Sequence, residues 1–136
     1  MDIIILVGRI LFCFIFLGGA AGHLTQTAMM AGIAEQKKVP APRAVVLITG
    51  VLLVAAALMI IVGAWADLAA LGLFLFLVPT AFVMHNFWAE SDPQVAMLEQ
   101  LHFLKDMSLA GACLIFFGLL NSGPDLGLFL TGPLFS

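Results

Sequence analysis

Charged residues are scarce in this sequence. Of its 136 residues, five are Lys or Arg and eight are Asp or Glu, whereas 63% are hydrophobic. A water-soluble globule of this size needs more polar surface than these residues supply, so the sequence predicts a protein that lies in a lipid bilayer. The basic residues are also too few and too scattered for a nucleic-acid-binding surface, so nucleic acid is excluded as a partner.

Motifs for metals and redox cofactors are missing as well. The two cysteines, Cys13 and Cys113, lie far apart in apolar runs, and no two of the three histidines have the spacing of a metal site. There is no haem, flavin or iron–sulfur motif. We therefore expect no metal and no intrinsic cofactor, so electrons would have to be carried by a partner, a bound quinone or the two thiols.

Long apolar runs, in contrast, fill most of the chain. A run of ~20 residues crosses the ~30 Å hydrocarbon core of a bilayer at ~1.5 Å per residue. We expect spans at residues 3–25, 44–66, 68–88 and 103–123, with an interfacial helical extension over about 93–104. The first span is expected to be retained and to continue helically to Ile33. The sequence thus predicts an all-α integral membrane four-helix bundle, with residues 1–136 forming a single transmembrane domain.

Prolines mark the expected boundaries between these helices. The polar stretch 35–43 contains two prolines and is predicted to be a loop. Pro79 lies inside the third span and should kink it, because it removes a backbone hydrogen bond. Asp92 followed by Pro93 is typical of a helix start, since the carboxylate can cap free N–H groups and proline lacks one.

Basic residues also predict the orientation in the membrane. Lys37, Lys38 and Arg43 lie between the first and second spans, and Lys105 lies at the entry to the fourth. Because basic residues favour the cytoplasmic side, we expect these ends in the cytoplasm and both termini outside.

Arg9 is an ionisable residue about two turns into the first span. Such a group costs several kcal/mol unless it is solvated or paired. Asp67, Asp125 and Asp2 are expected on the same side of the membrane and could approach it, and Asp67 or Asp125 is the predicted partner. The alternative is that Arg9 extends to the outer headgroups.

A second polar group is expected at the cytoplasmic ends of the helices. The candidate ligand or proton site consists of His23, His85, Trp88, His102 and Lys105. His102 and Lys105 are three residues apart and share a helix face, with Glu99 and Asp106 at one-turn spacing. Such a pocket could bind a quinone head group, relay protons or hold an anion. The alternative is that each His anchors its helix at the interface.

The two cysteines are expected at the same depth. Cys13 and Cys113 each lie roughly 15 Å from the outer end of their helices, at ~1.5 Å per residue. They are candidate redox thiols if they meet, and otherwise small hydrophobic residues.

Ordered short motifs resemble those of the DoxX family of small four-helix bacterial membrane proteins. They are Arg9 followed by the small-residue run 16–23, a Pro-bearing first loop, His85-Asn86-Phe87-Trp88 ending the third span, the Asp92-Pro93 step, and the stretch 103–112. The resemblance covers most of the chain. It implies a four-helix bundle in the bacterial inner membrane, associated with membrane redox systems such as quinol oxidase and thiosulfate:quinone oxidoreductase complexes.

The resemblance also bears on single residues. By position, it implies that Arg9, His85, Trp88 and Lys105 are family-typical. Two features depart from the family pattern: the second span lacks the Glu that members often carry, and His23 replaces a Lys.

Three functions remain open from the sequence. The first is an accessory subunit of a quinone- or thiol-linked membrane oxidoreductase assembly, which packs against other subunits and borders a quinone or small-molecule site. The second is a small oligomeric transporter or channel for a proton, an anion or a metabolite, with Arg9 and the His/Lys group as polar stations. The third is a structural assembly factor without a ligand.

Overall fold

The computed structural model describes residues 2–123 and 127–135, and helices are the only regular secondary structure in these residues. In chain order the elements are α1 (Asp2–Thr25), α2 (Thr27–Gln36), α3 (Pro42–Val62), α4 (Ala66–Met84), the 3-10 turn η1 (Phe87–Ala89) and α5 (Pro93–Asn121). Four segments are long and apolar enough to cross a membrane: α1, α3, α4 together with η1, and α5. The predicted all-α membrane bundle is confirmed.

Large apolar side chains cover the outward faces of these helices. Ile4, Ile48 and Ile115, on three different helices, are each at least 65% exposed. Because these helices lie in a bilayer, such side chains contact lipid rather than water.

Local chemistry explains most of the helix ends. The Asp92 carboxylate accepts hydrogen bonds from the N–H groups of Gln94 (2.8 Å) and Val95 (3.3 Å), so α5 begins where the sequence predicted. The predicted interfacial extension and fourth span form one continuous helix, α5. The second span ends at Val62, earlier than predicted, because Gly63 adopts the left-handed conformation (φ 74°) that ends helices.

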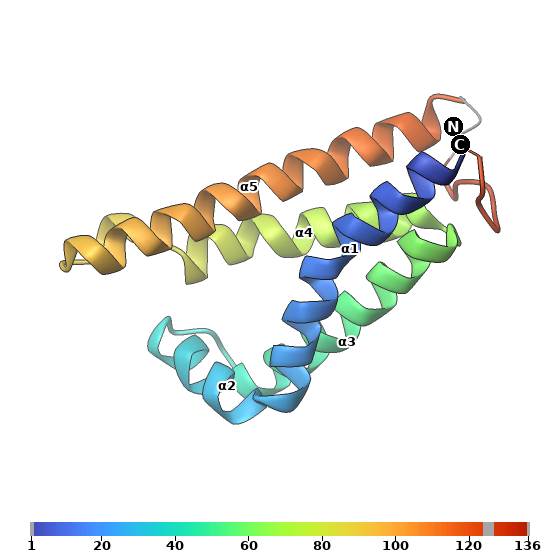
Figure 1. Ribbon diagram of the computed structural model, residues 1–136. Coiled ribbons are helices and arrows are strands. Elements are labelled where there is room, and N and C mark those ends of the chain that lie inside the picture. The colour runs from blue at the N-terminus through green and yellow to red at the C-terminus, as the bar shows by residue number, and fades with distance from the viewer. Residues whose placement is uncertain (1, 124–126, 136) are drawn as a thin grey trace.

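The first helix does not continue to Ile33 as one element. α1 ends at Thr25, and Gln26 (φ −118°, ψ 33°) interrupts the helix before α2 begins. The Thr27 hydroxyl donates to the His23 carbonyl oxygen at 2.7 Å, and such side-chain bonds compete with the backbone ladder and bend helices. In Figure 1, α2 turns away from the direction of α1.

The long helices form two pairs. α1 packs against α3, α4 packs against α5, and α3 joins the pairs by packing against α4. Figure 1 shows the pairs close together at the end that holds both termini and diverging toward the other end, where α2 lies. All four long helices contribute to one core, which includes Cys13, Phe16, Leu53, Ala57, Ile60, Leu73, Leu77, Ala110 and Cys113.

Residues 127–135 fold over the end where the pairs converge. The Gly63 carbonyl oxygen accepts hydrogen bonds from the N–H groups of Leu130 (3.1 Å) and Thr131 (3.2 Å). The Thr131 hydroxyl accepts a hydrogen bond from the Trp65 N–H at 2.9 Å. The C-terminal segment, which is too short to span a bilayer, therefore caps the α3–α4 turn.

Candidate functional site

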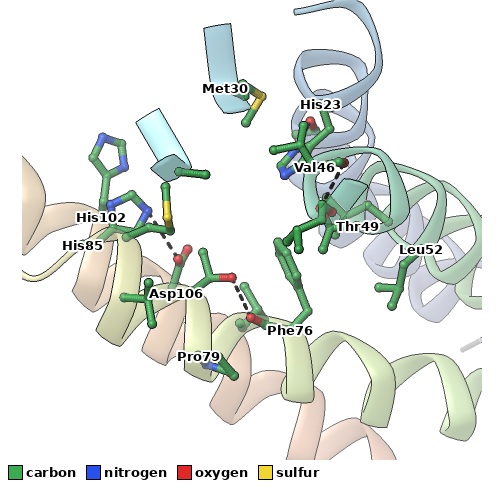
Figure 2. Close-up of a pocket in the computed structure, with 18 of the residues that line it drawn as sticks. His23, Met30, Val46, Thr49, Leu52, Phe76, Pro79, His85, His102 and Asp106 are labelled. Carbon is green, nitrogen blue, oxygen red and sulfur yellow. Dashed lines mark hydrogen bonds and ion pairs between the residues drawn. The ribbon is translucent and has the colours of Figure 1, made fainter. Parts of the chain in front are cut away.

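A cavity of about 820 Å³ lies between the two helix pairs. Side chains of α1, α2 and α3 form one wall, and side chains of α4 and α5 form the other (Figure 2). Most of the lining is apolar and includes Phe16, Leu53, Phe76 and Leu77. Small-molecule sites typically have volumes of about 300–1,000 Å³ and apolar walls with a few polar groups, so this cavity has the size and lining of a ligand site.

The polar groups of the cavity gather around His85, which follows α4. Its Nδ1 lies 2.8 Å from Glu99 Oε2, and its Nε2 lies 3.6 Å from Asp106 Oδ2. An ionised carboxylate only accepts hydrogen bonds, so His85 Nδ1 carries the proton and donates to Glu99. Asp106 lies just beyond hydrogen-bond distance on the other side of the ring.

Two further residues of α5 extend this network. The His102 ring stacks on the His85 ring, with centroids 5.1 Å apart and planes 27° apart. Lys105 Nζ lies 3.2 Å from Asp106 Oδ1. Asp106 is only 4% exposed, so neighbouring side chains rather than water must balance its charge.

His23 approaches the cavity from the opposite wall (Figure 2). Its Nδ1 lies 2.8 Å from the Gly19 carbonyl oxygen. A carbonyl oxygen only accepts hydrogen bonds, so Nδ1 carries the proton, and Nε2 of the neutral ring is an acceptor. The cavity thus has a hydrogen-bond acceptor on one wall and the His85–carboxylate network on the other.

The two walls also contact each other near α2, at the end where the helix pairs diverge. Lys37, just after α2, donates to Asn86 Oδ1 at 2.6 Å and to Glu90 Oε1 at 3.0 Å. Met84 of α4 packs against a small buried cluster from α2 and α3. We call the Lys37–Asn86–Glu90 contact the polar bridge; it links the α2 end to the α4–α5 connection.

Four of the five predicted site residues line this cavity: His23, His85, His102 and Lys105. The fifth, Trp88, lies outside the cavity and is 57% exposed. Its ring belongs to an aromatic cluster with Phe82, Phe87 and Phe103. Trp88 therefore has the surroundings of a membrane-interface side chain.

Sequence reasoning missed the polar bridge and understated the carboxylates. Lys37 entered only as a charge that sets orientation, although its ammonium group reaches the other helix pair. Glu99 and Asp106 entered only as neighbours of His102 and Lys105, yet both flank His85. Their seven-residue spacing along α5, about two helical turns, was the available signal, because it places both on one face of the helix.

Arg9 is 4% exposed, and no ion pair joins it to a carboxylate of the described residues. Asp67, one predicted partner, accepts backbone hydrogen bonds through Oδ2 from Leu134 (2.6 Å) and Phe135 (3.1 Å). Asp125, the other predicted partner, lies outside the described residues. Asp67 therefore holds the C-terminal segment in place.

The two cysteines are free thiols in the same buried core. Both are 0% exposed, and the Cys13 thiol donates to the Ala57 carbonyl oxygen at 3.4 Å. A buried thiol of this kind packs as a small hydrophobic side chain. The redox role remains a prediction.

The described residues contain no group of three or more His, Cys, Asp and Glu side chains that could hold a metal ion.

Comparison with known proteins finds one family. The family model described as DoxX matches residues 4–86, which is more than half of the chain. No curated protein and no solved structure matches the chain.

Proposed function

Because this chain belongs to the DoxX family, we propose that it is an accessory membrane subunit of a quinone-linked oxidoreductase assembly and that its cavity borders or binds the quinone. One observation supports this most directly. The roughly 820 Å³ cavity has apolar walls and a His–carboxylate network at one end.

The chemistry of quinones suits such a cavity. The ring carbonyls of a quinone accept hydrogen bonds, and the hydroxyls of the quinol donate them, while the tail is a hydrocarbon. An imidazole N–H at His102, which stacks on His85, can donate to a carbonyl, and His23 Nε2 can accept from a hydroxyl. Leu53, Phe76 and other apolar side chains of the cavity can cover the tail.

In the proposed assembly this chain transfers no electrons on its own. Its sequence has no haem, flavin or iron–sulfur motif. In the proposed assembly another subunit carries the electrons, and this subunit holds the head group and provides ionisable side chains near it.

The proposed location is the bacterial inner membrane, with both termini outside the cytoplasm. Lys37 and Lys105 line the same cavity, so the basic residues that set the predicted orientation lie at the cavity end of the molecule. This orientation places the polar end of the cavity in the cytoplasmic leaflet.

A transporter or channel is less well supported. Arg9 lies beside the C-terminal segment that caps the α3–α4 turn, whereas the His–carboxylate network lies at the other end of α4, as two stations of a path would. Between them lies the packed core, in which Ala57, Ile60 and Leu73 are 0% exposed. The described residues of one chain therefore provide no polar path between the two stations.

Purification in mild detergent provides the first test. The whole chain would be isolated from its native membrane, followed by mass spectrometry of co-purifying proteins and extracted small molecules. Recovery with oxidase or dehydrogenase subunits, or with quinone, supports the proposal. A homo-oligomer with neither contradicts it and favours the transporter.

Direct binding provides the second test. Decylubiquinone should raise the unfolding temperature of the detergent-solubilised protein, and His85→Ala should reduce this effect. Trp88→Phe is the matched control, because Trp88 is an aromatic residue near His85 in sequence but outside the cavity. If decylubiquinone raises the unfolding temperature equally in His85→Ala, Trp88→Phe and the wild-type protein, the quinone does not bind beside His85.

A further inference from the structure

Arg9 lies on α1, two helical turns from Asp2, and takes no part in the quinone cavity. The C-terminal segment covers it. Arg9 Nη2 donates to the Leu128 carbonyl oxygen at 2.5 Å, and the guanidinium carbon lies 4.2 Å from the centre of the Phe129 ring. These contacts shield the guanidinium from water at the membrane surface.

The remaining polar atoms of Arg9 have no partner in the part of the chain that the structure describes. Nε and Nη1 are buried and make no hydrogen bond to residues 2–123 or 127–135. Within residues 2–123 and 127–135, no carboxylate forms an ion pair with Arg9, and Asp67 Oδ2 is occupied by backbone N–H groups. Arginine cannot lose its proton in proteins, so this buried charge needs an anion from outside the described residues.

A second cavity lies beside Arg9. It has a volume of about 240 Å³, and its other lining residues are apolar and come from α1, α3 and α5: Ile5, Gly8, Phe12, Ile60, Ala112 and Phe116. Gly8 is exposed, and a Cβ atom at this position would have no neighbour within 4 Å. The cavity therefore opens on the lipid-facing surface beside α1.

A buried guanidinium beside an apolar cavity favours one kind of ligand. A guanidinium binds phosphate or carboxylate oxygens through two parallel hydrogen bonds. A small soluble anion would gain nothing from the apolar walls, whereas an anion attached to a hydrocarbon chain would contact both the guanidinium and the walls. The opening toward lipid gives such a molecule direct access.

We propose that Arg9 and the adjacent groove between α1 and α5 form a binding site for an anionic phospholipid. Its headgroup phosphate pairs with the guanidinium, and its acyl chain lies along Ile5, Phe12 and Phe116. The site shares no lining residue with the quinone cavity, so lipid binding at Arg9 does not depend on whether the chain binds quinone.

Thermal unfolding of the full chain in detergent tests the site. Added phosphatidylglycerol should raise the unfolding temperature by at least about 3 °C more than the same amount of phosphatidylcholine. Arg9→Gln should abolish this difference between the two lipids. A wild-type protein that does not distinguish the lipids, or an Arg9→Gln variant that keeps the preference, would overturn the proposal.

A pair of glycine variants covers the case in which Arg9→Gln does not fold. Gly8→Leu adds a bulky apolar side chain to the lining of the groove while keeping Arg9, and it should reduce the phosphatidylglycerol effect. Gly18→Leu is the matched control, because Gly18 is an exposed glycine on the same helix, has open space around it and lies outside the groove. Equal lipid effects in the two variants would overturn the proposed groove.

Two controls address the source of the anion. Inorganic phosphate should give no comparable stabilisation at the concentration of the lipid, and an equal effect would overturn the assignment to a lipid. Asp125→Asn should leave the preference for phosphatidylglycerol unchanged. If this variant instead strengthens the preference, Asp125 is the counter-charge and the native site does not need a lipid.

Discussion

Gly50 of α3 lies directly against His23 of α1. A Cβ atom at position 50 would lie 2.9 Å from the His23 Cβ and 2.9 Å from Leu24 Cδ2. Carbon atoms this close repel strongly, so α1 and α3 can cross at this point only because Gly50 has no side chain. The crossing sets the position of His23 on the cavity wall.

Gly50→Ala should therefore separate the two helices and displace His23. We expect a loss of about 1–3 kcal/mol in the free energy of unfolding, as for other overpacked cores, and weaker binding of decylubiquinone. Gly111→Ala is the control, because Gly111 is an exposed helical glycine with nothing within 4 Å. That variant should be unchanged or slightly more stable. Equal unfolding temperatures for the two variants would contradict the close crossing.

Asp106→Asn should weaken the His85 network. Asparagine keeps the shape of the side chain but removes the negative charge that faces both Lys105 and His85. Because the site is buried, we expect a loss of about 1–3 kcal/mol in stability. Asp92→Asn makes the same chemical change at the start of the same helix and should be nearly neutral, since Asn caps helices as well as Asp does. Chemical denaturation of both variants measures the difference, and a neutral Asp106→Asn would show that the carboxylate charge is unimportant.

Helix lengths and connectivity made the depth of many residues predictable. His85, His102 and Lys105 were placed together because the third and fourth spans are consecutive and antiparallel, so their ends must meet. The same reasoning placed His23 at that end of the bundle. The Asp92–Pro93 helix start followed from local capping chemistry alone.

The rotation of side chains around the helix axes was not predictable from the sequence. Trp88 was grouped with the histidines because it lies at the same depth, but it faces away from the cavity. All four long helices are apolar on most faces, so their periodicity does not indicate which face is buried. The direction of α2 and the fold of residues 127–135 were also not predictable from the sequence. Backbone contacts, such as the hydrogen bond from the Leu130 N–H to the Gly63 carbonyl oxygen, leave no periodic pattern of side chains in the sequence.

Lys37→Gln should loosen the polar bridge and expose the cavity. The ammonium group makes the contacts to Asn86 and Glu90, and a glutamine keeps the polarity but not the charge. A cysteine at Thr49, which lines the cavity, reports on access through its rate of reaction with a water-soluble maleimide. A contact worth about 0.2–1 kcal/mol predicts labelling that is about 1.5- to 5-fold faster.

Two features of the chain serve as controls for this labelling. Cys13 and Cys113 are 0% exposed and should contribute little background. Lys38→Gln removes the same charge from the next residue, which is exposed, and should leave the rate unchanged. If both lysine variants accelerate labelling equally, the effect comes from net charge rather than from the bridge.

Gly63→Ala should detach the C-terminal segment from the α3–α4 turn. Gly63 has φ 74°, and a Cβ atom there would lie 2.7 Å from both the Phe129 Cα and Arg9 Nη1. Left-handed backbone alone costs a residue with a side chain about 1–2 kcal/mol, and the contact with the Phe129 backbone adds to this cost because a backbone cannot rotate away. Gly123→Ala separates the two effects, since Gly123 also has positive φ (86°) but a Cβ atom there would have no described atom within 4 Å. The segment should become sensitive to protease in the Gly63 variant only, because only that variant disturbs the backbone hydrogen bonds to Leu130 and Thr131. Equal proteolysis of the two variants would mean that the left-handed conformation, and not the close contact with Phe129, controls the position of the segment.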